Sequence, residues 1–371
     1  MSKMYLKIYF IVVACLLCLV ALFNYFIDPG SIYFKQKYNS LVIQKYTELL
    51  LESKFGMIQE GWPERDVKLS LLTRASNSDC ILLGSSHVMS ISLYQGNGIS
   101  NLCESLVNLG VSGAVLEDFM IFSDRLLSEK KDFRGKKIII GIDPWFYNFS
   151  RDSRHIPYLN TLKKELKNNL IEAKNYSSTF LLNLISFDYF FESLKLLKRD
   201  GLENNLKKIL LLLSVNSDYQ SYVSLFKMEM FSFEKGAEKA VTLSDGSHVY
   251  SKKYITESHE MNGGNYKLVN GMLYDKKAIH VFEDILSNLK ARGFKIYLLF
   301  TPYHQNVWNK KSGKLAQNAM QATYQISAVL AEKLNLSIIG SYHPDELKCK
   351  KDEFYDFMHP KPSCLNKIFI K

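Results

Sequence analysis

The chain has 371 residues, of which 47% are hydrophobic and 23% are charged, and its formal net charge at pH 7 is +10. This balance excludes an intrinsically disordered chain and is sufficient for a sizeable buried core. The excess charge comes mainly from lysines, without the arginine clusters or zinc-finger spacing of nucleic-acid-binding proteins, so we expect no nucleic-acid partner. A solvated, lysine-rich surface is the simplest explanation of the positive net charge.

Residues 8–27 form an apolar run that is interrupted only by Asn24 and is preceded by Lys3 and Lys7. A helix of this length spans the hydrocarbon core of a bilayer. The two lysines favour a cytoplasmic tail over residues 1–7, with everything after the run on the outer side. The alternative is a cleaved signal peptide, which the length of the run and the lack of a small-residue cleavage site disfavour.

Four cysteines would then lie in a compartment where disulfides persist: Cys80, Cys103, Cys349 and Cys364. Their spacing allows three pairings, and free buried thiols are an equal alternative. A bridge between Cys349 and Cys364 would close the segment that carries the histidine and aspartate considered below.

After a linker and helical lead-in at 28–77, the sequence predicts an α/β domain over 78–371. Short apolar strands are expected at 81–83, 105–109, 136–142, 294–300 and 337–340. Helical spacing of apolar residues is found at 115–127, 278–289 and 315–334. Such alternation predicts a parallel sheet that is covered by helices on both faces, in a flavodoxin-like, three-layer α/β fold.

The alternation stops between about 150 and 270, where lysine- and leucine-rich stretches predict a large helical insertion. The apolar stretch 180–198 contains amide and acidic side chains, so it is interpreted as a packed helix and not as a second membrane span. Residues 244–266 are rich in glycine and serine and are predicted to be a long loop or lid.

Ligands bind at the carboxyl ends of the strands in open parallel sheets. The predicted strands are followed by polar or turn residues, among them Ser86 after the first strand. The candidate substrate contacts at these ends are Ser85, His87, Asn108, Asp143, Asn148, Tyr303 and His304.

A serine nucleophile needs a base, and the base needs a partner that fixes its tautomer. Asp356 and His359 are three residues apart, so within one turn the carboxylate can reach the imidazole. Each signal alone also has a structural explanation, because small residues after a strand commonly cap a helix. The other histidines lack metal-ligand companions at useful spacing, so we expect no metal and no cofactor.

Together, the stretches "ILLGSSH", "NLGVSG" and "DFMHP" resemble blocks one, two and five of the SGNH (GDSL-type) hydrolase superfamily. The resemblance implies that Ser86 is the nucleophile, His359 the general base and Asp356 the acid that orients it. It also implies an oxyanion hole formed by the backbone N–H groups of Ser86 and Gly113.

Block three of this family supplies an asparagine donor to the oxyanion hole, and Asp143 stands in its place here. An ionised carboxylate cannot donate a hydrogen bond and would repel an oxyanion. The hole would therefore consist of two N–H groups, from Ser86 and Gly113, unless Asn148 or a protonated Asp143 contributes a third donor; losing one donor costs about 10²–10³ in rate. The resemblance covers about residues 78–145 and 275–365.

The anchor and the "DPG" that follows it resemble a membrane-anchored subset of the superfamily, which takes part in acylation of bacterial teichoic acids and exopolysaccharides. This resemblance implies a serine acyltransferase or esterase outside the bacterial cytoplasmic membrane, modifying a cell-envelope glycan beside a membrane-bound O-acyltransferase. The alternative is a non-catalytic scaffold or glycan-binding subunit of an acylation complex.

Overall fold

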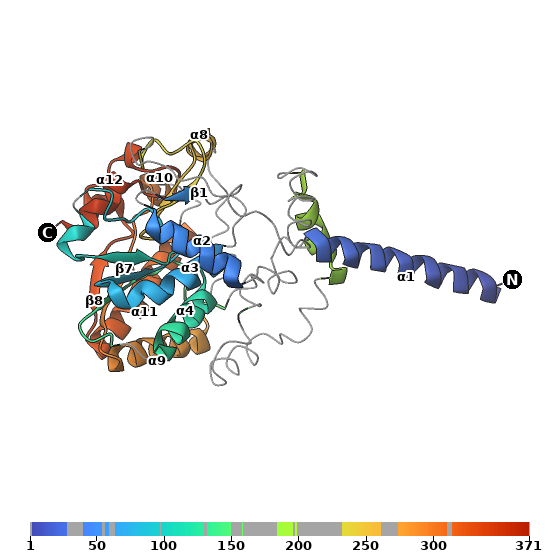
Figure 1. Cartoon of the computed structure of the whole chain (residues 1–371), viewed down its shortest axis with the longest axis horizontal. Helices are drawn as coiled ribbons and strands as arrows, with labels where there is room; N and C mark the ends of the chain where they lie inside the picture. The colour runs from blue at the N-terminus through green and yellow to red at the C-terminus, as the bar shows by residue number, and fades with distance from the viewer. Residues whose placement is uncertain are drawn as a thin grey trace. The chain divides into compact units, whose positions relative to one another are not determined.

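The computed structural model divides into two compact units, Met1–Val42 with Arg151–Gln220, and Ile43–Ser150 with Ser221–Lys371 (Figure 1). Most of the helical insertion expected between about 150 and 270 lies outside the described residues. The structure describes residues 2–27, 40–53, 56–58, 64–96, 98–129, 132–149, 158, 184–195, 197–198, 232–260, 274–309 and 314–370.

In the first unit, helix α1 runs from Ser2 to Ile27 (dark blue in Figure 1). Its stretch Met4–Ile27 is 24 residues long and is apolar enough to cross a membrane. The side chains of this stretch are mostly exposed to the surroundings, unlike those of a core helix in a globular protein. The helix is therefore consistent with the predicted single-pass anchor.

The second unit is built on a five-stranded parallel sheet with the order β3-β2-β4-β7-β8. Counted along the chain, this is the order 2-1-3-4-5 of flavodoxin-like sheets. The strands are β2 (Cys80–Leu83), β3 (Leu106–Asn108), β4 (Lys137–Gly141), β7 (Lys295–Phe300) and β8 (Ser337–Gly340). The predicted α/β class and parallel sheet are confirmed.

Helices of this unit cover the sheet. Successive side chains of a strand point to opposite faces, so the unbroken burial of β2 and β3 means that both faces are covered there. The longer helices are α2 (Ser40–Glu52), α3 (Glu64–Leu71), α4 (Leu116–Ser128), α9 (Lys276–Ala291) and α11 (Lys314–Leu334). Shorter turns of helix are η2 (Leu72–Asn77), η3 (Ile99–Asn101), α10 (Gln305–Asn309), η8 (Pro344–Leu347), η9 (Lys351–Glu353), α12 (Pro362–Leu365) and η10 (Asn366–Phe369).

A small antiparallel sheet and a helix replace part of the loop that we expected at 244–266. Strands β1 (Met57–Ile58), β5 (Val241–Thr242) and β6 (His248–Val249) pair in that order, and α8 (Lys252–Glu260) follows. The loop prediction was wrong for this part because an Asp-Gly pair between short apolar runs is a hairpin signal. Asp245 makes the turn by accepting a hydrogen bond from the Ser247 N–H at 2.8 Å.

Two buried cations of α3 fasten the lead-in to the sheet. Arg65 Nε donates to Asp118 Oδ1 of α4 at 2.6 Å. Lys68 Nζ donates to the backbone oxygen of Asn108 at 3.0 Å and to that of Gly246, and burial lowers its pKa to about 8. The end of β3 and the β5–β6 hairpin are thus tied to one helix.

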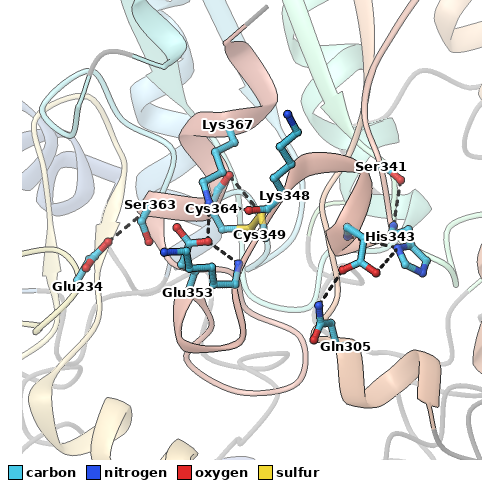
Figure 2. Close-up of a disulfide and its surroundings, with 12 residues drawn as sticks. Glu234, Gln305, Ser341, His343, Lys348, Cys349, Glu353, Ser363, Cys364 and Lys367 are labelled. Atoms are coloured by element: carbon cyan, nitrogen blue, oxygen red, sulfur yellow. Dashed lines mark hydrogen bonds and ion pairs between the residues drawn. A yellow bond between two sulfur atoms is a disulfide. The ribbon is translucent and has the colours of Figure 1, made fainter.

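The four outer cysteines form two disulfides, Cys80–Cys103 and Cys349–Cys364. The second bridge encloses the C-terminal segment that carries Asp356 and His359. Figure 2 shows it beside an ion pair in which Lys367 Nζ donates to Glu353 Oε2 at 2.6 Å. The bridge and the ion pair together hold the base of this segment.

Replacing both Cys349 and Cys364 by alanine is expected to lower the free energy of unfolding by about 3 kcal/mol. The bridge joins cysteines that are 15 residues apart. Breaking it gives the unfolded chain more conformational entropy, and for a loop of this size that entropy favours unfolding by about this amount. Urea unfolding of the full-length protein in mild detergent measures the change. Alanine at the free Cys15 and Cys18 of α1 is the control; an unchanged midpoint for the first variant would show that the bridge contributes nothing.

Candidate active site

Strand β2 is followed by a tight turn in which one side chain keeps access to solvent. From Cys80 to Ser92, every residue other than Ser86 is buried. Gly84 permits the turn, because a Cβ atom there would lie 2.5 Å from Cγ2 of Val88. The local fold therefore presents the Ser86 hydroxyl while its neighbours pack inward.

The Ser86 hydroxyl begins a chain of hydrogen bonds that ends on a carboxylate. Its Oγ lies 2.8 Å from His359 Nε2, and His359 Nδ1 lies 2.7 Å from Asp356 Oδ2. The other carboxylate oxygen, Oδ1, accepts the backbone N–H groups of Met358 at 2.7 Å and His359 at 2.8 Å. The three predicted residues, from opposite ends of the α/β domain, are thus brought together.

The charge of Asp356 sets the tautomer of the histidine. Burial alone would raise the pKa of Asp356, but the His359 imidazole and the two backbone N–H groups lower it to about 2. The carboxylate is therefore ionised near neutral pH and accepts the proton on Nδ1. This leaves the lone pair of Nε2 toward Ser86, the arrangement that a general base requires.

The loop that carries the aspartate and histidine is closed on itself. Phe354 and Pro360 form an antiparallel bridge across its base, and the Tyr355 N–H donates to the His359 oxygen at 2.9 Å. The His304 N–H donates to the Phe357 oxygen at 3.0 Å, which joins the loop to the segment after β7. These backbone bonds fix where the imidazole lies.

Two tyrosines that sequence reasoning missed complete this side of the site. The rings of Tyr250 and Tyr254 are stacked, with centroids 4.9 Å apart. Tyr250 OH donates to the Ser86 backbone oxygen at 3.2 Å, and Tyr254 OH donates to Asp356 Oδ2 at 3.4 Å. Burial and the Asp356 carboxylate raise the pKa of Tyr254, so it remains a donor. Tyr250 follows β6 and Tyr254 lies in the first turn of α8, so their only sequence signal is a spacing of four residues.

Asp143 forms a buried pair with His87, the residue after the candidate nucleophile. Asp143 Oδ1 lies 3.2 Å from His87 Nδ1. Burial raises the pKa of Asp143 to about 7, against an opposing hydrogen bond with Ser85, and lowers the pKa of His87 well below its usual value. The site thus favours an uncharged pair, in which the Asp143 hydroxyl donates to Nδ1. The role of Asp143 as a donor in the oxyanion hole stays a prediction.

The His87 ring lies next to the catalytic candidates. Its centroid is 5.2 Å from that of His359 and 4.9 Å from that of the fully buried Tyr303. Among the residues that the structure describes, His87 Nε2 has no hydrogen-bond partner. In the uncharged pair this nitrogen carries the hydrogen, because Nδ1 accepts from the carboxylic acid.

Replacing Asp143 by asparagine is expected to stabilise the protein more at pH 8 than at pH 5. A carboxyl with a raised pKa holds its proton in the folded state after the unfolded chain has lost it, so stability falls as the pH rises from about 4 to about 7. His87, Ser85 and Tyr342 face this carboxyl, and the variant leaves all three in place. Melting temperatures at the two pH values test the prediction.

The matched control is Asp284→Asn on the exposed face of α9, which should shift neither melting temperature. An Asp143→Asn effect of equal size at pH 5 and pH 8 would contradict the proposed protonation of the buried pair.

Asn108, a predicted substrate contact, is fully buried behind the serine turn. Its Nδ2 donates to the backbone oxygens of Val88 and Ile91, both at 2.9 Å, and its Oδ1 accepts the Gly110 N–H at 2.9 Å. The amide therefore holds the turn that presents Ser86. Its direct contact with a substrate stays a prediction.

Gly113, the other predicted oxyanion donor, lies in the turn after β3 with a φ of +56°, a value that glycine adopts without strain. The loop runs beside the serine turn, since the Val111 N–H donates to the Gly84 oxygen at 3.0 Å. Asn148 is half-buried in the segment after β4. The roles of Gly113 and Asn148 in an oxyanion hole stay predictions.

Ser85 is buried, and its Oγ accepts the His87 N–H at 3.3 Å. His304 is half-buried and packs its ring against Phe354 and Phe357, each with centroids 5.4 Å apart. Ser85, a predicted substrate contact, thus has its partner in the serine turn. His304, also a predicted substrate contact, has its partners in the loop that carries His359. Within the described ranges, no cluster of three or more histidine, cysteine, aspartate or glutamate side chains is placed to hold a metal ion.

The assembled geometry joins a partly exposed serine, a histidine in the tautomer of a base, and an ionised carboxylate at the carboxyl edge of a parallel sheet. Such an arrangement can activate a hydroxyl for nucleophilic attack. Comparison with models of protein families gives no match, and comparison with curated protein sequences gives no significant match, so the interpretation of this site rests on its own residues.

Proposed function

We propose that the chain is a membrane-anchored serine acyltransferase or esterase that acts on a cell-envelope glycan outside the bacterial cytoplasmic membrane. The observation that carries the proposal is the hydrogen-bonded chain Ser86–His359–Asp356. The apolar helix α1 supports attachment to a membrane, and the two disulfides suit an oxidising compartment. Sequence motifs and strand order together support an SGNH-type fold for the second unit.

In the proposed reaction, Ser86 Oγ attacks the carbonyl carbon of an ester while His359 Nε2 takes the hydroxyl proton. The Asp356 carboxylate stabilises the resulting imidazolium. The oxyanion is stabilised by the backbone N–H groups of Ser86 and Gly113. When the carbon–oxygen bond of the ester breaks, His359 returns its proton to the leaving alkoxide, and the acyl group remains on Ser86.

The second half of the reaction transfers this acyl group. His359 accepts a proton from the hydroxyl of a glycan, or from water, as that oxygen attacks the acyl-serine. The proton then returns to Ser86 Oγ as the bond to the acyl group breaks. Transfer to a glycan gives an acyltransferase and transfer to water an esterase. We propose that a membrane-bound O-acyltransferase supplies the acyl group from across the bilayer.

Labelling with a fluorophosphonate tests the proposal, because this reagent forms a bond to an activated serine oxygen and releases fluoride. Full-length protein in mild detergent should be labelled, and Ser86→Ala should not be. Ser287→Ala, at an exposed serine of α9, is the matched control and should be labelled like the wild type.

A non-catalytic scaffold of an acylation complex is the second candidate function. Asp143 favours it, because the residue stands where the family has its donor asparagine. Absence of labelling in wild-type protein that unfolds cooperatively would favour the scaffold and reject the enzyme. The intact hydrogen-bonded chain at Ser86 favours the enzyme.

A further inference from the structure

In the first unit, a second segment of the chain packs against the end of α1. Asn24, in the last turns of this helix, is fully buried. Its Nδ2 donates to the backbone oxygens of Leu184 at 2.8 Å and Ser186 at 3.2 Å, and its Oδ1 accepts the Ser193 hydroxyl at 3.3 Å. An amide that would be costly in a bilayer is thus satisfied by another segment of the chain.

That segment continues as a helix over residues 187–195, with Phe190 packed against Phe23 of α1 at a centroid distance of 5.1 Å. The face that bears Ser193 is buried against α1. Asn24 lies three residues before Ile27, about 5 Å along the axis from the end of α1. The helix is therefore docked at the depth where the membrane span ends.

The outward side of this helix has an apolar strip and a polar strip. Phe187 is 63% exposed, Phe191 is 56% exposed, and Leu194 continues the strip at the helical spacing of i, i+4 and i+7. Beside it, Glu192 and Lys195 form an exposed ion pair at 2.6 Å. Left in water, these phenylalanine side chains forgo the free energy that their burial would release.

We propose that helix 187–195 lies in the interface of the bilayer, with the strip of Phe187, Phe191 and Leu194 in lipid and the Glu192–Lys195 strip toward water. The sequence alone suggested only a packed helix. The inference rests on insertion of α1 in a membrane and is independent of the proposed chemistry.

Lipid is the occupant that the position favours. The strip belongs to a helix that packs on the end of α1, and the last turns of α1 themselves expose Leu22, Tyr25 and Phe26. Aromatic side chains are enriched where a span meets the interface. A helix with one apolar and one charged strip is the form that lies in the plane of this interface.

Site-specific fluorescence tests the proposal. Full-length protein with Cys15→Ala and Cys18→Ala receives one new cysteine, which is labelled with an NBD fluorophore and reconstituted in phosphatidylcholine–phosphatidylglycerol vesicles. Phe191→Cys should lose emission with nitroxide-labelled lipid and keep it with iodide. Glu192→Cys, the adjacent residue on the polar strip, should show the reverse. Phe187→Cys provides a second probe of the apolar strip.

Leu19→Cys, in the middle of the span, reports on α1 itself and should be quenched by the nitroxide lipid. Quenching of the Phe187 and Phe191 probes by iodide, with Leu19 still in lipid, would overturn the inference alone. Shielding of these probes from both quenchers would mean that protein covers the strip, and would also overturn it. Iodide quenching at Leu19 would reject the anchor and the inference with it, leaving the proposed chemistry to the labelling test.

Discussion

Replacing Ser86 by alanine is expected to lower the rate of ester hydrolysis by about 10⁴-fold or more while leaving the fold intact. Among the described residues from Cys80 to Ser92, Ser86 alone is not buried, and its Oγ lies 2.8 Å from His359 Nε2. Alanine removes the oxygen that would carry the acyl group and fills the same turn without strain. Initial rates with p-nitrophenyl acetate measure the loss.

Two results would contradict this prediction. Wild-type protein that releases p-nitrophenol no faster than a heat-denatured sample would show that the serine is not activated. A Ser86→Ala variant that keeps the wild-type rate would place the activity elsewhere. The surface variant Ser287→Ala controls for nonspecific effects of losing a hydroxyl.

Replacing Asp356 by asparagine is expected to lower the same rate by about 10³–10⁴-fold through the tautomer of His359. In the wild type, one carboxylate oxygen accepts two backbone N–H groups and the other accepts His359 Nδ1–H. The amide oxygen of asparagine can keep the backbone bonds, but its NH₂ group then faces Nδ1. The histidine must accept there, so its proton moves to Nε2 and the nitrogen facing Ser86 can no longer act as a base.

Because the wild-type pKa of Asp356 is about 2, this carboxylate stays ionised from pH 5 to pH 8, and the deficit of the variant should persist across that range. Asp352→Asn, at an exposed position of the same segment, should keep the wild-type rate. The prediction is contradicted if Asp356→Asn has an unchanged melting temperature and a rate within threefold of the wild type. Such rates differ by only about 0.6 kcal/mol in activation free energy, so the carboxylate would not set the tautomer.

Periodicity predicted the parallel sheet and its main helices because each strand of the sheet is a short apolar run between helical patterns. The same reasoning predicted that Ser86 and the C-terminal histidine share a site. In a parallel sheet the carboxyl ends of the strands meet at one edge, so a serine after β2 and a histidine loop after β8 can share a site. These features depend on local pattern and on topology.

Other features depend on contacts between distant residues, which spacing does not reveal. The stacked Tyr250 and Tyr254 reach the site only because the Asp-Gly hairpin and α8 fold over it. The pairing of Cys80 with Cys103 follows from the adjacency of β2 and β3, whereas the sequence left three pairings open. The pKa of Asp143 is raised by burial, and the sequence alone gives no measure of that burial.

The most direct test is to trap the acyl-enzyme. Full-length protein is mixed with p-nitrophenyl acetate, quenched in acid within the first turnovers, digested and examined by tandem mass spectrometry. The mechanism predicts one acetyl group on Ser86 in the wild type and none on this residue in His359→Ala. Consumption of the ester with the acetyl group on Ser85 or elsewhere, or with no acetylated serine at all, would contradict the proposal that Ser86 carries the acyl group.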